Sequence, residues 1–215
     1  MRSLLGYGVL AGPFYLVVGL VQALVRDGFD LGRHALSLLA NGPGGWVQTA
    51  NFVLSGGMVV AAAVGFARVL RPQSRAASWF LGAFGASMIA AAVFRVDPVD
   101  GFPPGTPEGM PTTVSTSGLL HFMAGGIGFL ALAVSCFLVA VALSRRAQPG
   151  MARLSLLSGI MVLGGFVGPM VLPIPMPSPV AGIWLAVVVG WAWLAVTSVH
   201  LYRASPHPDG PMRGR

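Results

Sequence analysis

The stretch that decides the fold runs from Leu119 to Leu143 and reads LLHFMAGGIGFLALAVSCFLVAVAL. It contains no Asp, Glu, Lys or Arg, and Arg145 and Arg146 follow it closely. A helix needs about 20 mainly apolar residues to cross a hydrocarbon layer of about 30 Å. The stretch is long enough for one crossing, and its basic end is typical of an anchor at the membrane surface. It therefore predicts a transmembrane helix.

Five further apolar stretches of comparable length predict five more spans. They cover residues 4–25, 46–69, 78–94, 154–172 and 180–201. Of the 215 residues, 55% are hydrophobic and only 9% are charged, against about 25% charged residues in a soluble domain. This composition excludes a soluble globule. We expect an all-α polytopic membrane protein, a six-helix bundle over residues 1–203, followed by a disordered cytoplasmic tail over residues 204–215.

The charged residues predict the orientation of the bundle. Three of the thirteen arginines lie with five acidic residues on one side of the six spans. The other ten lie on the side of the two termini, with one aspartate: Arg2, Arg68, Arg71, Arg75, Arg145, Arg146, Arg153, Arg203, Arg213 and Arg215. Because basic loops stay on the cytoplasmic side, we expect a multi-pass protein of the cell (plasma) membrane with both termini cytoplasmic. The basic net charge then reflects topology, and no nucleic acid partner is expected.

The first candidate segment follows the first span, from Asp30 to Pro43, on the predicted outer side. Asp30 is a suitable helix cap, and Gly42 and Pro43 are suitable stop residues. The segment predicts a short amphipathic outer-loop helix. At 100° per residue, its polar side chains share one face: Asp30, His34, Ser37 and Asn41, with Arg33 beside them. This face either contacts water, as in an ordinary interfacial helix, or turns inward to form a site.

Two more polar segments lie at the same ends of the third and fourth spans. Phe94-Arg95-Val96-Asp97-Pro98 ends one span, and Leu120-His121-Phe122 begins the next. An arginine and an aspartate at the mouth of a bundle are costly unless paired, so they tend to mark a site. The alternative is a snorkelling Arg95, an Asp97 that stops a helix before a proline, and a His121 that bonds backbone or water at the interface.

The three segments together resemble the domain-of-unknown-function 998 family. The resemblance rests on Arg-His-x-x-Ser-x-Leu (residues 33–39), Phe-Arg-x-Asp-Pro (residues 94–98) and Leu-His-Phe (residues 120–122), and it covers about residues 4–202. Members are six-span membrane proteins of bacteria and archaea. The resemblance implies six spans and an outward-facing site built from these segments. It implies no activity.

The favoured hypothesis is an outer-face site that binds or modifies a lipid or a small anionic molecule. In this hypothesis His34 or His121 acts as a base and Ser37 as a nucleophile, because a serine needs a nearby base to become reactive. The residues expected to bind the ligand are Arg33, Arg95, Asp97 and Asn41, since guanidinium groups pair well with phosphate and carboxylate. The sequence leaves open whether the protein is an enzyme, and it identifies no cofactor.

Two alternatives stand beside this hypothesis. The chain is either a structural or assembly subunit without catalysis, or an outer-face metal-binding protein that uses His34, His121, Asp97 and Asp100. No resident metal is expected in the favoured reading. Membrane lipids are the expected partners, and the sequence does not determine the oligomeric state. Coupled ion transport is disfavoured because the spans hold almost no ionisable residue.

Overall fold

Six long helices make up nearly all of the structure. The computed structural model describes residues 2–71, 73–171, 178 and 180–205. The helices are α1 (Arg2–Val25), α2 (Gly45–Val69), α3 (Ala76–Val93), α4 (Thr116–Ser144), α5 (Pro149–Val171) and α6 (Ala181–Ala204). Each is long and apolar enough to cross a membrane. The predicted all-α fold with six spans is confirmed. Most of the predicted tail, residues 206–215, lies outside the described residues.

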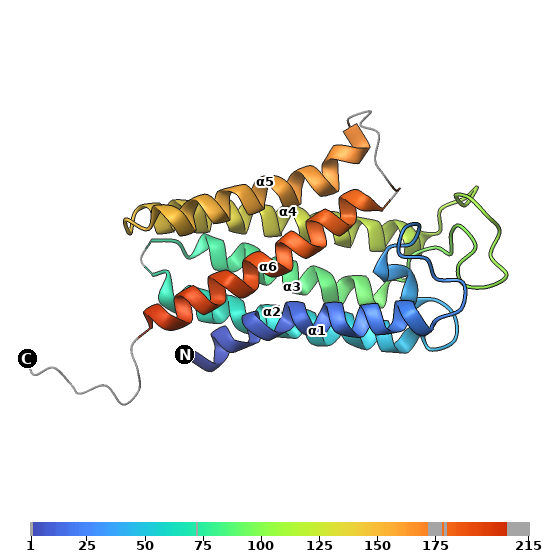
Figure 1. The fold of residues 1–215 in the computed structure, drawn as a ribbon, viewed down its shortest axis with the longest axis horizontal. Helices are drawn as coiled ribbons and strands as arrows, with labels where there is room; N and C mark the ends of the chain where they lie inside the picture. The colour runs from blue at the N-terminus through green and yellow to red at the C-terminus, as the bar shows by residue number, and fades with distance from the viewer. Residues whose placement is uncertain (1, 72, 172–177, 179, 206–215) are drawn as a thin grey trace, which may run out of the picture.

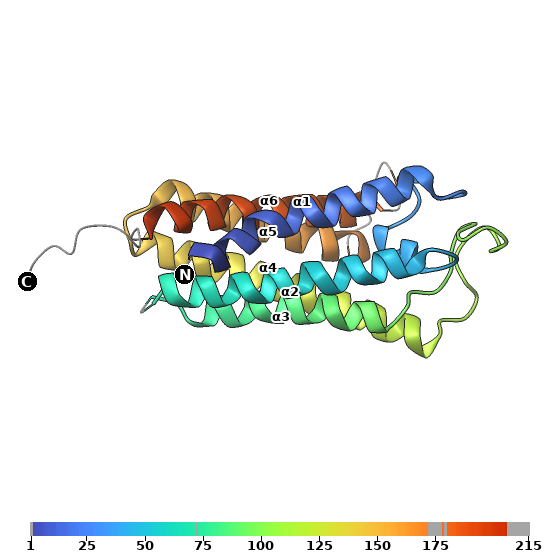
Figure 2. The same cartoon turned by 90° about the horizontal axis from the view of Figure 1, so that it is seen from below.

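The helices form a closed ring in which each packs mainly against its neighbours in sequence. The ring closes because α1 also packs against α6. α1 begins and α6 ends at the same end of the bundle, which we call the terminal end (Figure 1). The opposite end, the loop end, carries residues 26–44 and 94–115, which join α1 to α2 and α3 to α4 (Figure 2). The three segments predicted to carry function all lie in its half of the bundle.

Glycines bring neighbouring helices into close contact. A methyl group added at Gly56 on α2 would lie 2.6 Å from the carbonyl oxygen of Gly85 on α3. One added at Gly165 on α5 would lie 2.6 Å from the carbonyl oxygen of Gly182 on α6. Lipid tails are as apolar as leucine, so membrane helices associate through such backbone packing and not through a hydrophobic driving force between them. These contacts hold the ring together.

A buried chain of amide side chains also joins α1 to α2. Gln22 Nε2 donates to Gln48 Oε1 at 2.9 Å, and Asn51 Nδ2 donates to the same oxygen at 3.2 Å. Asn51 Nδ2 also donates to the carbonyl oxygen of Tyr15 at 3.0 Å. Hydrogen bonds between polar side chains stabilise helix pairs in lipid. The few polar residues within these two spans therefore help to hold the bundle together.

The predicted amphipathic α-helix after the first span is wrong in type and extent. The helix observed there is η1 (Leu36–Ala40), a five-residue 3-10 helix. It is preceded by a turn in which the carbonyl oxygen of Asp30 accepts from the backbone N–H groups of Arg33 and His34, at 3.1 and 2.7 Å. With about three residues per turn, and with the preceding turn outside the helix, the expected polar face does not form.

Local side-chain contacts explain the difference. The Asp30 carboxylate accepts from the N–H of Gly32 at 2.7 Å, and His34 Nδ1 accepts from the N–H of Asp30 at 3.0 Å. Such side chain–backbone bonds compete with the α-helical pattern, and glycine is a poor helix former. Leu36, Leu38 and Leu39 are all buried. Tertiary packing of these leucines therefore fixes η1 against the bundle.

We predict that Gly56→Leu destabilises the protein and that Gly57→Leu does not. At Gly56 a side chain meets the backbone of α3, whereas nothing lies within 4 Å of one added at Gly57. Overpacking of this kind costs about 1–3 kcal/mol. Thermal unfolding in detergent should show a lower midpoint for Gly56→Leu only. Equal midpoints for the two variants would contradict close α2–α3 contact.

Candidate functional site

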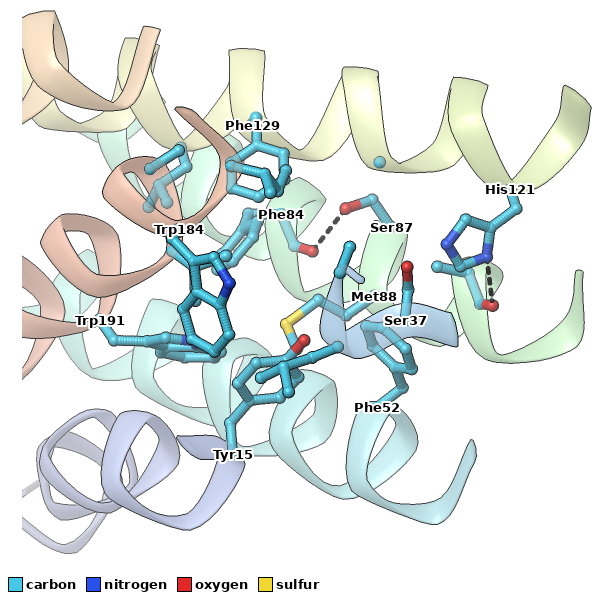
Figure 3. A pocket seen from close by; sticks show the side chains of 18 residues that line it. Tyr15, Ser37, Phe52, Phe84, Ser87, Met88, His121, Phe129, Trp184 and Trp191 are labelled. Atoms are coloured by element: carbon cyan, nitrogen blue, oxygen red, sulfur yellow. Dashed lines mark hydrogen bonds between the residues drawn. The ribbon is translucent and has the colours of Figure 1, made fainter. Parts of the chain in front are cut away.

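A cavity of about 110 Å³ lies inside the bundle, in its loop-end half. Its wall is formed by η1 and by side chains from α1, α2, α3, α4 and α6. Six of its eighteen lining residues are Phe, Tyr or Trp, and Figure 3 shows the rings of Tyr15, Phe84, Trp184 and Trp191 around the same space. Among the residues that the structure describes, no Arg, Asp or Glu lines it. The cavity is therefore an uncharged, largely apolar chamber within the predicted membrane region.

The fold supplies these rings from the inner faces of the helices. Tyr15 packs against Phe52 and Trp191, with ring centroids 5.7 and 5.3 Å apart. Phe84 packs against Trp191 on its other side, at 5.8 Å. These aromatic side chains, from α1, α2, α3 and α6, thus form a connected series of contacts inside the helix bundle. Because these large flat side chains pack against one another, they leave the cavity between them, and the small residues of the same helices do not fill it.

His121 is the most informative polar group in this wall. It is 9% exposed and lies near the start of α4. Its Nδ1 lies 2.7 Å from the carbonyl oxygen of Phe94 and 3.1 Å from that of Ala91, both at the end of α3. Carbonyl oxygens only accept, so Nδ1 carries the proton, and in the neutral ring Nε2 is an acceptor. Nε2 has no hydrogen bond within the described chain and faces the cavity (Figure 3).

Ser37, Ser87 and Tyr15 contribute the other polar groups of the wall. Ser87 Oγ donates to the carbonyl oxygen of Phe84 at 2.7 Å, so its own lone pairs stay available. Ser37 is half-buried on η1, and no hydrogen bond joins it to His121 in the part of the chain that the structure describes. Ser37 and His121 therefore share a chamber without the contact that activates a serine. Their catalytic roles stay predictions.

Arg33 is held by two acids of the opposite loop. Its Nε and Nη2 donate to the two carboxylate oxygens of Asp100 at 2.9 and 2.7 Å, and Nη2 also pairs with Glu108. Arg33 lowers the pKa of Asp100 to about 2, with a smaller contribution from the N–H of Gly109. The same two acids raise the pKa of Arg33 above its usual range. This exposed ion pair ties residues 26–44 to residues 94–115.

His34 lies beside this ion pair and not in the cavity. It is 1% exposed, and its ring packs against Phe29 and Phe102. Its Nδ1 accepts from a backbone N–H, so its Nε2 carries the proton and donates to the carbonyl oxygen of Asp100 at 3.0 Å. Both ring nitrogens of His34 are therefore occupied by backbone groups. Its observed role is to join the two loops.

Asn41 joins the same two loops. Its side-chain Nδ2 donates to the carbonyl oxygen of Val96 at 2.9 Å, and its backbone carbonyl oxygen accepts from the guanidinium of Arg26 at 2.7 Å. The guanidinium of Arg26 also lies over the ring of Phe102, 5.3 Å from its centroid. Arg26 and Phe102 were not singled out from the sequence. In the sequence, the aromatic Phe102 within a polar loop was a possible sign of a buried contact at this end of the bundle.

Arg95 and Asp97 lie apart from the cavity and from each other's side chains. Arg95 is exposed at the loop end, and only its carbonyl oxygen is bonded, to Ser117 Oγ at 2.9 Å. Asp97 Oδ2 accepts from the N–H of Ser115 at 2.9 Å, and Asp97 packs against Gly118. Asp97 thus sits at the N-terminus of α4, where a negative charge is favourable. Their ligand-binding roles stay predictions.

Of the seven residues predicted to form one outer-face site, the structure brings only Ser37 and His121 to a common cavity, and Arg33 and Asn41 lie in the contacts between the two loops. His34, Arg95 and Asp97 lie outside it. Within the described residues, no three His, Cys, Asp or Glu side chains gather as a metal site would require. Sequence reasoning missed the aromatic wall, because aromatic residues inside a span look the same whether they face lipid, a neighbouring helix or a cavity.

The fold defines this chain as a polytopic helical membrane protein. Large apolar side chains are exposed along all six long helices, as expected for surfaces that contact lipid and not water. The chain belongs to the family described as "Protein of unknown function (DUF998)", whose model matches residues 9–200. The family resemblance of the sequence is thereby confirmed. No curated protein and no solved structure matches the chain.

We predict that Asp100→Asn lowers the thermal stability in detergent at neutral pH and that this difference fades in acid. The pKa of Asp100 is lowered in the folded protein from 3.8 to about 2. The contribution of Asp100 to the free energy of unfolding is therefore fully present above its ordinary pKa, and it is lost as the pH falls from about 4 to about 2. Unfolding midpoints of both proteins between pH 7 and pH 2 measure this.

Asp27→Asn is the matched control, because Asp27 is an exposed aspartate of the same end of the bundle. It should match the unchanged protein at every pH. A constant difference between Asp100→Asn and the unchanged protein down to pH 2 would show that the ion pair does not stabilise the loop end.

Proposed function

We propose that this membrane protein binds an uncharged, mainly apolar molecule, or the apolar end of a lipid, in the cavity of its loop-end half. The observation that carries the proposal is the aromatic chamber itself. Protein interiors are close-packed, and voids larger than a water molecule are few. A chamber whose wall draws on five helices and η1 is more readily explained as a site than as a packing fault.

The charges argue for a lipid-like ligand and against a small anion. Arg33 is neutralised by Asp100 and Glu108, and no arginine of the described part of the chain lines the cavity. An anion buried there without a partner would carry a large desolvation cost. The part of the ligand that enters the cavity is therefore uncharged. Of the two ligand classes expected from the sequence, a lipid and a small anionic molecule, we therefore favour the lipid.

The volume limits what enters. A cavity of about 150 Å³ lined by apolar side chains holds benzene, and this one measures about 110 Å³. It accommodates one ring or a short piece of chain, and the rest of a longer ligand extends beyond it. The aromatic wall suits such a group, because flat rings offer a large contact area at low cost in side-chain entropy.

Quenching of tryptophan fluorescence by bromobenzene tests this proposal. Trp46 and Trp79 are strongly exposed, so both are first replaced by phenylalanine. The remaining signal then comes from Trp184 and Trp191 in the cavity wall and from the neighbouring Trp193. We predict saturable quenching in detergent, and its loss in Gly125→Leu. Gly125 lines the cavity, and nothing lies within 4 Å of a side chain added there.

Gly164→Leu is the matched control. Gly164 is exposed on α5, has equally open surroundings and does not line the cavity. It should keep saturable quenching. Quenching that is unsaturable and equal in all three proteins would refute ligand binding and favour the alternative of a structural or assembly subunit.

We further propose that the loop end faces out of the cell and that both termini are cytoplasmic. Eight arginines of the described chain lie at the terminal end, whereas the loop end has Arg26, Arg33 and Arg95. Basic residues concentrate on the cytoplasmic side of a membrane. The cell (plasma) membrane is the location that this orientation implies, and lipids are the partners that it brings into contact with the bundle.

Labelling of single cysteines in intact cells tests the orientation. Cys136 is buried and is first replaced by serine. Thr112 at the loop end and Ser144 at the terminal end are both exposed. We predict that a membrane-impermeant maleimide labels Thr112→Cys, and labels Ser144→Cys only after lysis. The reverse pattern would invert the proposed topology.

A further inference from the structure

We infer that the ligand of this cavity carries a neutral hydroxyl group, as an alcohol or a phenol, which donates a hydrogen bond to Nε2 of His121. The inference rests on the proposed function and adds the chemical class of the ligand. Three observations carry it: the fixed ring of His121, its unused acceptor, and the absence of charge around it.

The ring of His121 is fixed by the end of α3. The last carbonyl groups of a helix have no partner within the helix, and two of them, on Ala91 and Phe94, accept from Nδ1. The ring of Phe52 packs edge-on against the imidazole, at 6.2 Å and 78°. Nε2 is therefore held in one direction, toward the cavity, as a pre-positioned acceptor (Figure 3).

This acceptor has no partner within the described chain, although His121 is only 9% exposed. Nε2 is not closed off from its surroundings, so a water molecule or a ligand can reach it from the cavity. A ligand that displaces this water has to donate to Nε2 in its place, or the hydrogen bond is lost. The site therefore discriminates strongly against an analogue that lacks the donor, since the analogue leaves the acceptor unpaired. A hydroxyl at the end of an apolar ring or chain supplies the required donor.

The surroundings of Nε2 exclude charged donors and acceptors. Within residues 2–71, 73–171, 178 and 180–205, no carboxylate lines the cavity to balance an ammonium group, and no arginine lines it to balance a carboxylate or phosphate. Ser87 donates to the carbonyl oxygen of Phe84, so toward the cavity its hydroxyl oxygen can only accept, whereas the hydroxyl of Ser37 can donate or accept. The aromatic rings of Phe84, Phe129 and Trp191 cover the remaining wall. The chamber thus suits one hydroxyl on an apolar body.

4-Bromophenol and bromobenzene form a matched pair of probes, because they differ only by the hydroxyl group. Both are titrated by tryptophan quenching in the protein whose Trp46 and Trp79 are phenylalanine. Quenching by probe that has only partitioned into the detergent is measured in Gly125→Leu, whose cavity is filled, and is subtracted. We expect 4-bromophenol to bind about tenfold more tightly than bromobenzene, the size of one good hydrogen bond to a fixed partner.

His121→Asn isolates the role of Nε2. The asparagine amide keeps a donor for the carbonyl oxygens of α3 but places no acceptor where Nε2 lies. We expect it to abolish the preference for 4-bromophenol and to keep bromobenzene binding, which also shows that the cavity is intact. His200→Asn is the matched control, because His200 bonds Gln148 at the terminal end. It should keep the tenfold preference.

The outcomes separate this inference from the proposed function. Equal binding of the two probes, or a preference that survives His121→Asn, overturns hydroxyl recognition while leaving the cavity as a binding site. Failure of both probes to quench saturably in the unchanged protein overturns the proposed function itself, and the inference with it.

Discussion

Close approach of neighbouring helix backbones is the constraint on which the rest of this structure depends. In lipid there is no water to drive helices together, so the bundle relies on direct packing. Gly56 against Gly85 and Gly165 against Gly182 place backbones in contact across the α2–α3 and α5–α6 pairs. Gly12 of α1 leaves room for the side chain of Trp191 on α6. These contacts close six helices into a ring, and a ring has an interior that must be filled.

The interior is filled unevenly. In the loop-end half, aromatic rings from α1, α2, α3 and α6 rest on one another and leave a chamber at their centre. His121 borders this chamber because the end of α3 needs a donor for its last carbonyl groups, and the α4 histidine supplies it. Nδ1 of the His121 imidazole therefore caps the end of α3, while Nε2 on its other side is an acceptor that faces an apolar space. In the proposed function, this division gives the cavity its preference for a ligand that carries a hydroxyl group.

The polar loop residues have partners within the loop end. Arg33, His34 and Asn41 all bond to residues 94–115, and together they hold η1 in place. η1 in turn closes part of the cavity wall through Ala35, Leu36 and Ser37. The charged cluster at the loop end is therefore support for the wall. Arg33 contributes to this support through its two acidic partners, Asp100 and Glu108.

The number of spans follows from the sequence alone, because hydrocarbon thickness sets the length of an apolar helix and backbone groups in lipid must bond within it. His121 and Ser37 could also be identified as candidates, since polar residues stand out in such a chain. The placement of His34, Arg33 and Asp97 could not, because each is decided by a partner far away in sequence: Asp100 for the first two and the start of α4 for the third. The α-helical periodicity assumed for residues 30–41 failed because side chain–backbone bonds at Asp30 and the burial of three leucines outweighed it. The sequence by itself thus determined which segments enter the membrane. Only the tertiary structure decided which side chains face the cavity, because helix rotation and loop contacts depend on packing between segments and not on the pattern within any one of them.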